Sequence, residues 1–183
     1  MTREEALDSI YENVENDNLV KHMLATEAIM GALAERLGRD KEEWRLAGLL
    51  HDIDVELTEG DMATHGRLGA DLLREMAVEE TIIHAILAHN EMLGVPCETD
   101  LDKALFCADP LTGLITAAAL VRPDKKLGSV EAKSVRKRFK EKSFAAGANR
   151  ENIATCSELG IELDDFIEIG LKAMQGIAGE LGL

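Results

Sequence analysis

The sequence predicts an all-α fold, and three observations support this prediction. Apolar residues recur at helical spacing through most of the chain, and no stretch alternates apolar and polar residues between hairpin turns. Aromatic residues make up only 3% of the chain and apolar residues 46%, so the core must consist mainly of Leu, Ile, Val, Ala and Met. This composition favours packed helices over sheets, which rely on aromatic and β-branched residues. We therefore expect residues 1–183 to form a single domain, a helical bundle.

The first half of the chain is predicted to form helices separated by short loops. The clearest helix runs from about Asn18 to Leu37, has an apolar stripe and ends at Gly38. Asp40 and Glu43 are spaced as a capping box for the helix that follows. The predicted helices cover about 3–15, 18–37, 41–57, 65–77 and 79–89.

The second half is also predicted to be helical after a loop over residues 91–100. Asp100 has the position of an N-cap for a helix that ends near Ala108. Asp109 followed by Pro110 is typical of a new helix start, because proline is tolerated at the first helical position. The predicted helices cover about 100–108, 109–121, 129–143, 149–159 and 164–181.

Charge is distributed unevenly along the chain. The formal net charge of −15 repels phosphate backbones, so we expect no nucleic-acid partner. Between Arg122 and Arg150, however, ten Lys and Arg residues stand against three acidic residues, which gives +7, while the rest of the chain carries −22. This basic segment is either a solvated helix face or a phosphate-binding patch.

Nothing in the sequence indicates a membrane or an oxidising compartment. No apolar run approaches the length of a bilayer span, and the first residues lack the pattern of a signal peptide. Cys97, Cys107 and Cys156 are odd in number and far apart, which indicates neither a disulfide framework nor a cysteine zinc site. We therefore expect a soluble, cytoplasmic protein with no membrane partner, and we leave open whether it forms a homo-oligomer.

All five histidines lie between residues 22 and 89. His22 falls on the apolar stripe of its helix, and the pair His51 and Asp52 follows an apolar stretch, so these side chains are expected to face inward. Buried carboxylates are costly unless they are paired or bind a metal, and neutral imidazole is a natural ligand for transition metals. Imidazoles and carboxylates that converge from different helices are typical of metal sites in helical bundles.

These residues stand in motifs that resemble the HD-domain family of metal-dependent phosphohydrolases, of the HDIG type. The resemblance covers about residues 18–121 and leaves 122–183 as the basic segment and C-terminal helices. The chain looks closest to a branch of small predicted hydrolases, and its motif order is similar to that of bacterial HD-type dinucleoside tetraphosphate hydrolases. The matching elements are, in order, Lys21-His22, the stretch Gly48-Leu49-Leu50-His51-Asp52-Ile53-Asp54, His65-Gly66, Ala88-His89-Asn90 and Ala108-Asp109.

The resemblance implies a metal site between helices and a hydrolase that uses a metal-activated water. The expected substrate is a small phosphomonoester or phosphoanhydride, in particular of a nucleotide. Asp52 is the expected catalytic residue, because its carboxylate would bridge two ions. Histidine and carboxylate ligands without thiolate favour divalent Fe or Mn, with Zn, Co or Ni as alternatives. The implied ligands are His22, His51, Asp52 and Asp109 for one ion, and Asp52, His65 and His89 for the second.

The chain departs from the HDIG signature at two positions. The signature has Gly and then a phosphate-contacting Lys where this chain has Asp54 and Val55. Asp54 is either an acceptor that orients a ligand histidine or a solvent-facing residue. Phosphate binding is therefore expected from the basic segment, with Asn90 as a further substrate contact. The candidate residues on one face of the 129–143 helix are Lys133, Arg136, Lys137 and Lys140.

Some of these residues also have structural interpretations, and two other functions remain open. Asp109 can cap a helix through one oxygen and bind a metal through the other, and His65 can be a loop residue. His84 and His89 project about 140° apart on an ideal helix, so His84 is expected in the core or beside a ligand. The alternative functions are an HD-fold diiron oxygenase, which anaerobic turnover would distinguish, and a non-catalytic binding protein stabilised by its metal.

Overall fold

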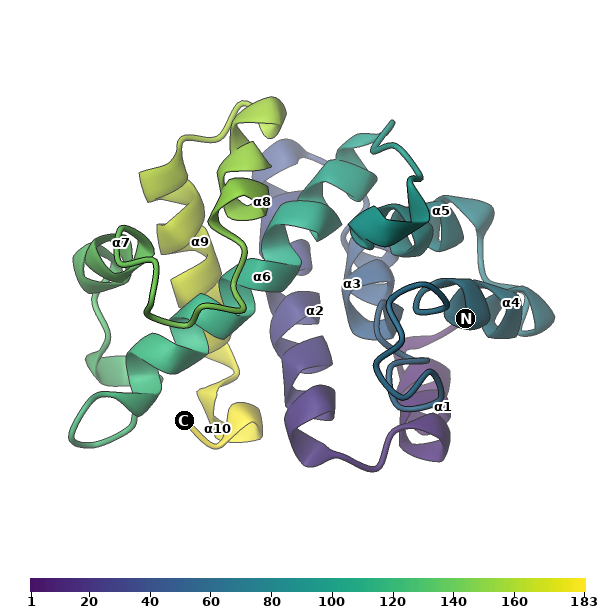
Figure 1. The fold of residues 1–183 in the computed structure, drawn as a ribbon, viewed down its shortest axis with the longest axis horizontal. Helices are drawn as coiled ribbons and strands as arrows, with labels where there is room; N and C mark the ends of the chain where they lie inside the picture. The colour runs from purple at the N-terminus through teal and green to yellow at the C-terminus, as the bar shows by residue number, and fades with distance from the viewer.

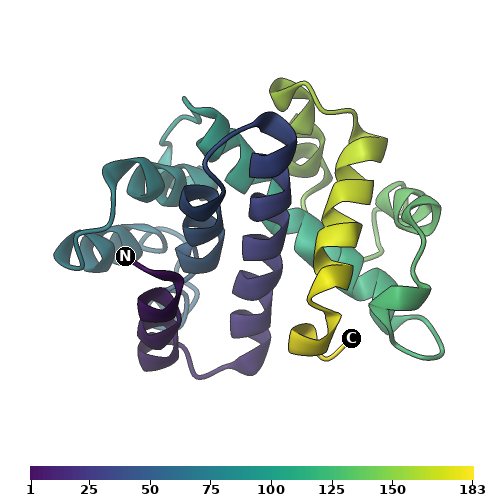
Figure 2. The same cartoon turned by 180° about the vertical axis from the view of Figure 1, so that it is seen from behind.

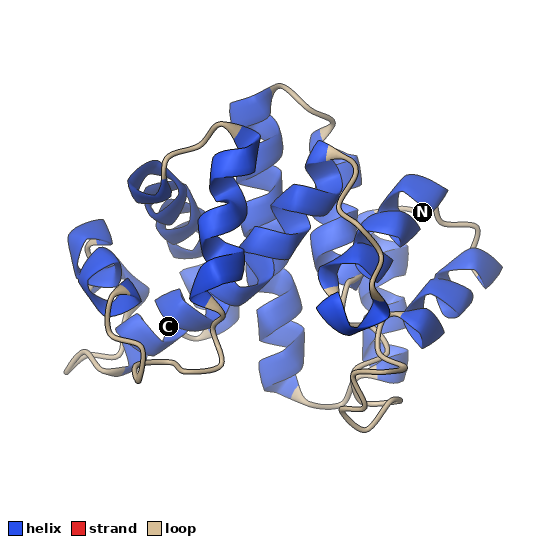
Figure 3. Ribbon diagram, turned by 45° about the horizontal axis from the view of Figure 1, so that its top comes forward, coloured by secondary structure: helices blue, strands red, loops and turns tan.

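The computed structural model describes residues 1–183 and contains only helices and loops, which confirms the all-α prediction (Figures 1 and 3). The α-helices are α1 (Arg3–Asn13), α2 (Asp17–Leu37), α3 (Lys41–Leu50), α4 (Arg67–Glu75), α5 (Glu80–His89), α6 (Asp100–Leu120), α7 (Ala132–Phe139), α8 (Arg150–Ala154), α9 (Leu163–Gly176) and α10 (Ala178–Leu181). Short 3-10 helices cover Glu91–Leu93, Leu127–Ser129 and Thr155–Leu159.

Two long helices, α2 and α6, organise the bundle. Helices α3, α2 and α9 stand side by side (Figure 2), and α6 runs obliquely across α2 (Figure 1). Helix α2 packs most extensively on α3, while α6 contacts α2, α5, α8 and α9. One continuous core of 45 buried residues fills the space between these helices. As a result, α2, α3, α5 and α6 can direct side chains toward one region.

Helix α3 lies very close to α2 because residue 48 is glycine. A Cβ atom at Gly48 would lie 2.9 Å from backbone atoms of Thr26 and Glu27, a distance that real Cβ atoms essentially never show. The helix ends at Leu50 rather than at the predicted residue 57, and residues 51–60 form turns. Tertiary contacts determine this end, because Asp54 in these turns is fully buried.

Residues 100–120 form one helix, so the prediction of two helices is wrong. Thr99, not Asp100, is the N-cap: its hydroxyl accepts from Asp102 N at 3.2 Å, and the Asp102 carboxylate accepts from Thr99 N at 2.8 Å. Pro110 lies inside the helix and removes one backbone hydrogen bond. Both halves of α6 are nevertheless buried in the core, and this burial outweighs the local signal for a break.

The continuity of α6 also bears on the expectation about membranes. Counted as one 21-residue helix, α6 is long and apolar enough by composition to cross a bilayer, which two short helices would not be. This is weak evidence for a membrane span, because a core helix passes the same test and 56% of the most apolar 18-residue window is buried in the fold.

The remaining helix ends agree partly with the sequence signals. Asp40 caps α3 by accepting from the backbone N–H groups of Glu42 and Glu43. The other half of the predicted capping box is absent, because the Glu43 carboxylate accepts from the Thr81 hydroxyl at 2.6 Å. The predicted helices 149–159 and 164–181 each end early and continue as shorter helices, and α7 is shorter than the predicted 129–143.

A single arginine holds the loop that follows α7. Helix α7 lies beside α9 and the end of α6, at the left of Figure 1. The Arg150 guanidinium donates to backbone carbonyls at the end of α7 and along this loop, including that of Ala148 at 2.6 Å. The accepting residues are Arg138, Phe139, Glu141, Phe144, Ala145 and Ala148.

Candidate metal centre

Elements from the whole first part of the fold bring the six predicted ligands together. Three of the side chains belong to helices and three to the turns that follow or precede helices. His22 lies in α2, His51 and Asp52 directly follow α3, His65 precedes α4, His89 ends α5, and Asp109 lies in the middle of α6.

His22, His51 and Asp109 form the first group of donor atoms. His22 Nε2 lies 3.1 Å from His51 Nε2 and 3.0 Å from Asp109 Oδ1. His51 Nε2 lies 3.8 Å from the same Asp109 oxygen. The ligand atoms of these three residues are all within 4.8 Å of one another, which is close enough to hold one metal ion.

Asp52 connects this group to a second one. Its Oδ2 lies 3.5 Å from His22 Nε2, while its Oδ1 lies 3.4 Å from His51 Nε2. On the other side, the same Oδ1 lies 3.2 Å from His65 Nε2 and 3.6 Å from His89 Nε2. The Nε2 atoms of His65 and His89 are 3.2 Å apart. The Asp52 carboxylate therefore lies between the two groups, the position that a bridging ligand requires.

Backbone carbonyls fix the orientation of two of the imidazoles. His51 Nδ1 donates to the carbonyl of Gly48 at 2.8 Å, and His89 Nδ1 donates to the carbonyl of Ile86 at 2.5 Å. Because a carbonyl only accepts, the Nδ1 atom of each ring carries the hydrogen, and the Nε2 atom of the neutral ring faces the centre unprotonated.

The Thr112 hydroxyl fixes the orientation of the His22 imidazole, and this role of Thr112 was not predicted from the sequence. The Thr112 hydroxyl donates to the carbonyl of Asp109 at 2.7 Å and so accepts from His22 Nδ1 at 2.9 Å. The signal was available in the sequence, because Thr112 follows Asp109 by one helical turn and so lies on the same helix face.

Asp54 orients His65, which answers the question that its position after the HD motif raised. Its Oδ1 accepts from His65 Nδ1 at 2.8 Å, and its Oδ2 accepts from the backbone N–H groups of Gly66 and Gly69 at 2.8 and 2.7 Å. Burial alone would raise the pKa of the Asp54 carboxyl, but these hydrogen bonds outweigh burial and lower it. Gly66 has a φ of 86°, a conformation that favours glycine and lets the chain turn here.

The four imidazoles fit a centre that contains cations. Neutral rings with the hydrogen on Nδ1 present unprotonated Nε2 atoms to each other at 3.1 and 3.2 Å, and two such atoms cannot form a hydrogen bond. A positive charge among them removes this repulsion. Imidazole and carboxylate donors without thiolate are the set that divalent transition metals bind, so the residues present fit a metal centre.

Protons can supply part of this charge in the metal-free protein. Burial disfavours protonation of His22, but the hydrogen bond and charge of Asp109, together with the charge of Asp52, outweigh burial and raise the pKa of His22 to about 9. Asp52 and Asp54 likewise overcome the burial of His65 and raise its pKa to about 10. Burial alone would raise the pKa of the Asp52 and Asp109 carboxyls, but the imidazoles hold both below the usual range.

Asn90 and His84 lie near the cluster but are not among its six side chains. The Asn90 amide donates to the carbonyls of Met62 and His65, both at 2.8 Å, so it ties the His65 loop to the end of α5. His84 lies outside the cluster of six. Its Nδ1 is 3.1 Å from the buried Asp102 Oδ2 but is not aligned for a hydrogen bond.

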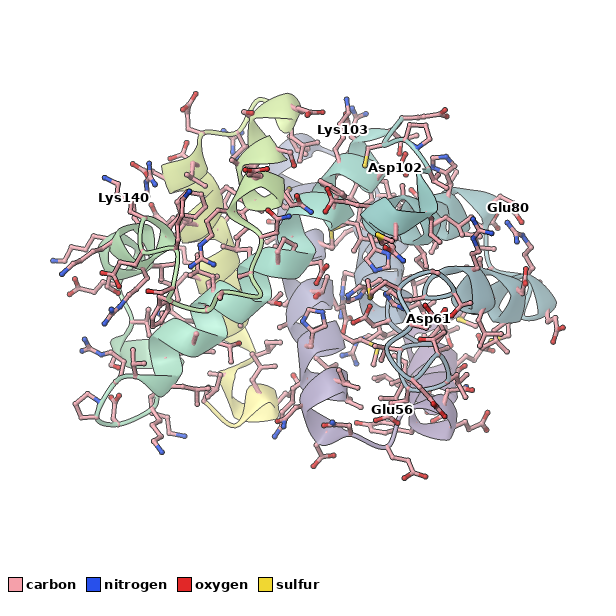
Figure 4. All side chains as sticks on the ribbon, viewed as in Figure 1. Glu56, Asp61, Glu80, Asp102, Lys103 and Lys140 are labelled. Atoms are coloured by element: carbon pink, nitrogen blue, oxygen red, sulfur yellow. The ribbon has the colours of Figure 1, made fainter.

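The structure does not bring the basic segment to the cluster. The basic quartet, Lys133, Arg136, Lys137 and Lys140, belongs to α7 and its C-cap. Lys133 pairs with Glu131 at 2.7 Å and Arg136 with Asp164 at 2.5 Å, while Lys137 and Lys140 are exposed. Figure 4 shows Lys140 at the opposite end of the molecule from Glu80, the first residue of α5.

Comparison with known proteins agrees with the fold and with this cluster. The HD-domain family matches residues 19–114, which is just over half of the chain. The chain therefore belongs to the HD-domain superfamily of metal-dependent phosphohydrolases, as the motifs predicted. Members of this family bind divalent metals, and two groups of donor atoms could each hold an ion here: His22, His51 and Asp109, and His51, Asp52 and His89.

Similar curated proteins carry the name ribonuclease Y. That of Oleidesulfovibrio alaskensis is 32% identical over 139 residues, covering 74% of this chain and 26% of the relative. That of Syntrophobacter fumaroxidans is 38% identical over 96 residues (52% and 18%), and that of Opitutus terrae is 25% identical over 169 residues (91% and 32%). The chain thus spans about a quarter of the length of the first of these relatives. No solved structure gives a significant match.

These relatives correct the expectation about partners. A ribonuclease acts on RNA, which contradicts both the small nucleotide substrate and the absence of a nucleic-acid partner. The prediction relied on the net charge of −15, which is a sum over the whole surface. Binding of a polyanion depends on the local field, and the chain concentrates half of its positive charge in one segment.

Proposed function

We propose that this protein is a metal-dependent phosphodiesterase that hydrolyses RNA. The observation that carries the proposal is the convergence of four oriented imidazoles and two carboxylates on one centre. RNA as the substrate class rests on the relatives named ribonuclease Y. The phosphomonoester and phosphoanhydride substrates expected from the motifs give way to a phosphodiester for the same reason.

We propose that the centre holds two divalent transition-metal ions, Fe or Mn in the first place and Zn, Co or Ni as alternatives. His22, His51, Asp52 and Asp109 would hold one ion, and Asp52, His65 and His89 the other, so that Asp52 is shared. When bound, these ions supply an activated water and neutralise charge on the phosphoryl group under attack.

The side chains of this protein supply order and electrostatics to that reaction. The Nδ1 acceptors Gly48, Ile86, Thr112 and Asp54 keep each imidazole in one tautomer, so no reorganisation is needed when substrate binds. The Asp52 carboxylate stays ionised at neutral pH because the imidazoles lower its pKa.

The test compares metal content and RNA cleavage in wild type and in Asp52→Ala. Elemental analysis of the wild type should give two ions per chain, and Asp52→Ala should lose both together with cleavage of a labelled oligoribonucleotide. Asp165→Ala, which removes an exposed carboxylate elsewhere, is the matched control and should keep both. Full metal occupancy in Asp52→Ala would refute the shared position of Asp52.

Three further outcomes separate the functional alternatives. Chelation should abolish cleavage, and added Mn or Fe should restore it. Turnover that requires oxygen would favour the diiron oxygenase. A fully loaded protein that cleaves no RNA or other phosphoester would favour a binding protein stabilised by its metal. We also propose that the protein acts in the cytoplasm, which its three free cysteines support.

A further inference from the structure

A pocket of about 450 Å³ opens beside the metal centre between α2, α6 and the C-terminal residues. In Figure 1, α10 lies between the lower part of α2 and the second half of α6, and Figure 2 shows α10 beside α2 from behind. The volume is within the range of small-molecule sites, roughly 300–1,000 Å³. Its lining residues are Asn18, Lys21, His22, Thr112, Gly113, Thr116, Leu120, Leu181, Gly182 and Leu183.

The pocket and the metal centre share the imidazole of His22. His22 is both a wall of the pocket and a member of the first donor group, with Nε2 3.0 Å from Asp109. Thr112, which orients that ring, also lines the pocket. A molecule in the pocket would therefore touch a member of the first donor group directly.

Lys21 is a cation without a carboxylate partner in this pocket. The lysines that form ion pairs are Lys41, Lys133 and Lys172, and Lys21 is not among them. Its Nζ lies 3.8 Å from the point where a Cβ on Gly182 would stand, so the ammonium group faces the C-terminal wall. A half-buried ammonium without a counter-charge beside a phosphohydrolase centre is suited to an anionic group of the substrate.

The other lining groups suit the rest of a nucleotide. The Asn18 side-chain amide and the Thr116 hydroxyl form no hydrogen bond within the protein, so both are available to polar atoms of a ligand. Leu120 and Leu181 supply an apolar wall. At Gly113 an added Cβ would meet no atom within 4 Å, so the α6 side of the pocket is open.

We propose that this pocket binds the nucleotide unit next to the scissile phosphate of RNA, and that Lys21 holds its non-reacting phosphate. The inference rests on the proposed function for the identity of the polymer. It also offers a replacement for the missing Lys of the HDIG signature, because Lys21 brings an ammonium group from α2 to a pocket that His22 also lines.

Two variants test the pocket, one by charge and one by volume. Lys21→Gln removes the cation, and Gly113→Leu fills the space without a backbone clash. Lys103→Gln, on the other end of α6, and Gly176→Leu, at an exposed helical glycine with no atom within 4 Å of its added Cβ, are the matched controls. All variants are purified with metal, and elemental analysis and thermal melting establish that centre and fold are intact.

The readouts are binding and cleavage measured separately. Binding uses metal-loaded protein and a fluorescent single-stranded oligoribonucleotide whose phosphorothioate linkages slow cleavage, and cleavage uses the unmodified oligoribonucleotide. Lys21→Gln should raise Kd and KM roughly tenfold to a hundredfold, as loss of a charge-assisted hydrogen bond does, with kcat and metal content unchanged. Gly113→Leu should raise both by at least as much, and both controls should match wild type.

Wild-type Kd and KM in both pocket variants would overturn the inference, as would a wild-type protein that binds no oligoribonucleotide. If the metal-loaded wild type binds the oligoribonucleotide but cleaves none, the proposed function fails. The binding measurements then still decide whether the pocket is the site.

Discussion

Replacing Gly48 by Ala should push α3 away from α2 and disturb the metal centre. The added Cβ would lie 2.9 Å from Glu27 N, from the Thr26 carbonyl carbon and from Met30 Cγ. Ordinary van der Waals contact begins at about 3.4 Å, and two of these three atoms belong to the backbone and cannot rotate away. The helix must therefore move by at least about 0.5 Å.

The cost follows from two opposing effects. Overpacking a core costs about 1–3 kcal/mol, and alanine regains about 0.5–1 kcal/mol over glycine inside a helix. The net loss, about 0–2.5 kcal/mol, lowers Tm by up to roughly 10 °C in a chain of this size. His51 moves too, because its Nδ1 donates to the Gly48 carbonyl, and so its Nε2 leaves the position 3.1 Å from His22 Nε2. Metal affinity should fall roughly tenfold to a hundredfold.

Melting in the presence of a chelator measures the packing cost alone, and a metal titration measures the effect on the centre. Gly176→Ala is the control, because an added Cβ there meets no atom within 4 Å, and it should leave Tm and metal affinity close to wild type. A Gly48→Ala variant with unchanged Tm and unchanged metal affinity would refute the reasoning that the close approach of α3 and α2 positions His51.

Three further predictions concern other parts of the molecule. Asp54→Asn should lower metal affinity about tenfold, because an amide cannot accept both from His65 and from the two backbone N–H groups, and an unchanged titration would contradict this. The metal-free protein should lose stability as the pH rises from 6.5 to about 10, because folding raises the pKa values of His22 and His65 from 6.5 to about 9 and 10. The stabilisation from these protonated rings is complete below pH 6.5. A Tm that stays level or rises between pH 6.5 and 10 would refute this prediction. Changing the basic quartet to Gln should raise KM for RNA and flatten its salt dependence with metal content unchanged, and wild-type values of both would leave the quartet as a solvated helix face.

The cluster of six side chains was predictable because its members stand in short, ordered motifs that resemble those of the HD-domain family. Histidines and carboxylates on inward-facing helix positions are costly in a core unless they share a cation, and the order of the motifs is carried by short stretches of sequence. The role of Thr112 was within reach for the same reason, since it is one turn from Asp109. Asp54 needed the structure, because its partners His65 and Gly69 come from another segment.

The errors arose where long-range packing opposes a local signal. Asp109 followed by Pro110 resembles a helix start, but the burial of residues on both sides keeps α6 continuous. Helix α3 ends at Leu50 for a similar reason, because the chain turns to bury Asp54. The direction in which the basic segment faces depends on how α7 packs on α9, which no residue of α7 encodes alone.

Because Arg150 holds the loop after α7 through backbone carbonyls, the backbone path of this region does not depend on the charges of its exposed side chains. The guanidinium contacts only backbone carbonyls there, and every residue type offers the same carbonyl. The exposed side chains of the loop and of α7 can therefore vary over evolutionary time while the backbone path is retained, whereas Phe144 and Ala145 pack against the core and Ala148 is buried in it. Descendants of one ancestral chain could exchange lysines for glutamates in this region, and so change the polymer or partner they attract, without refolding it. Arg150 itself has no such freedom, and any lineage that replaced it would have to rebuild the loop.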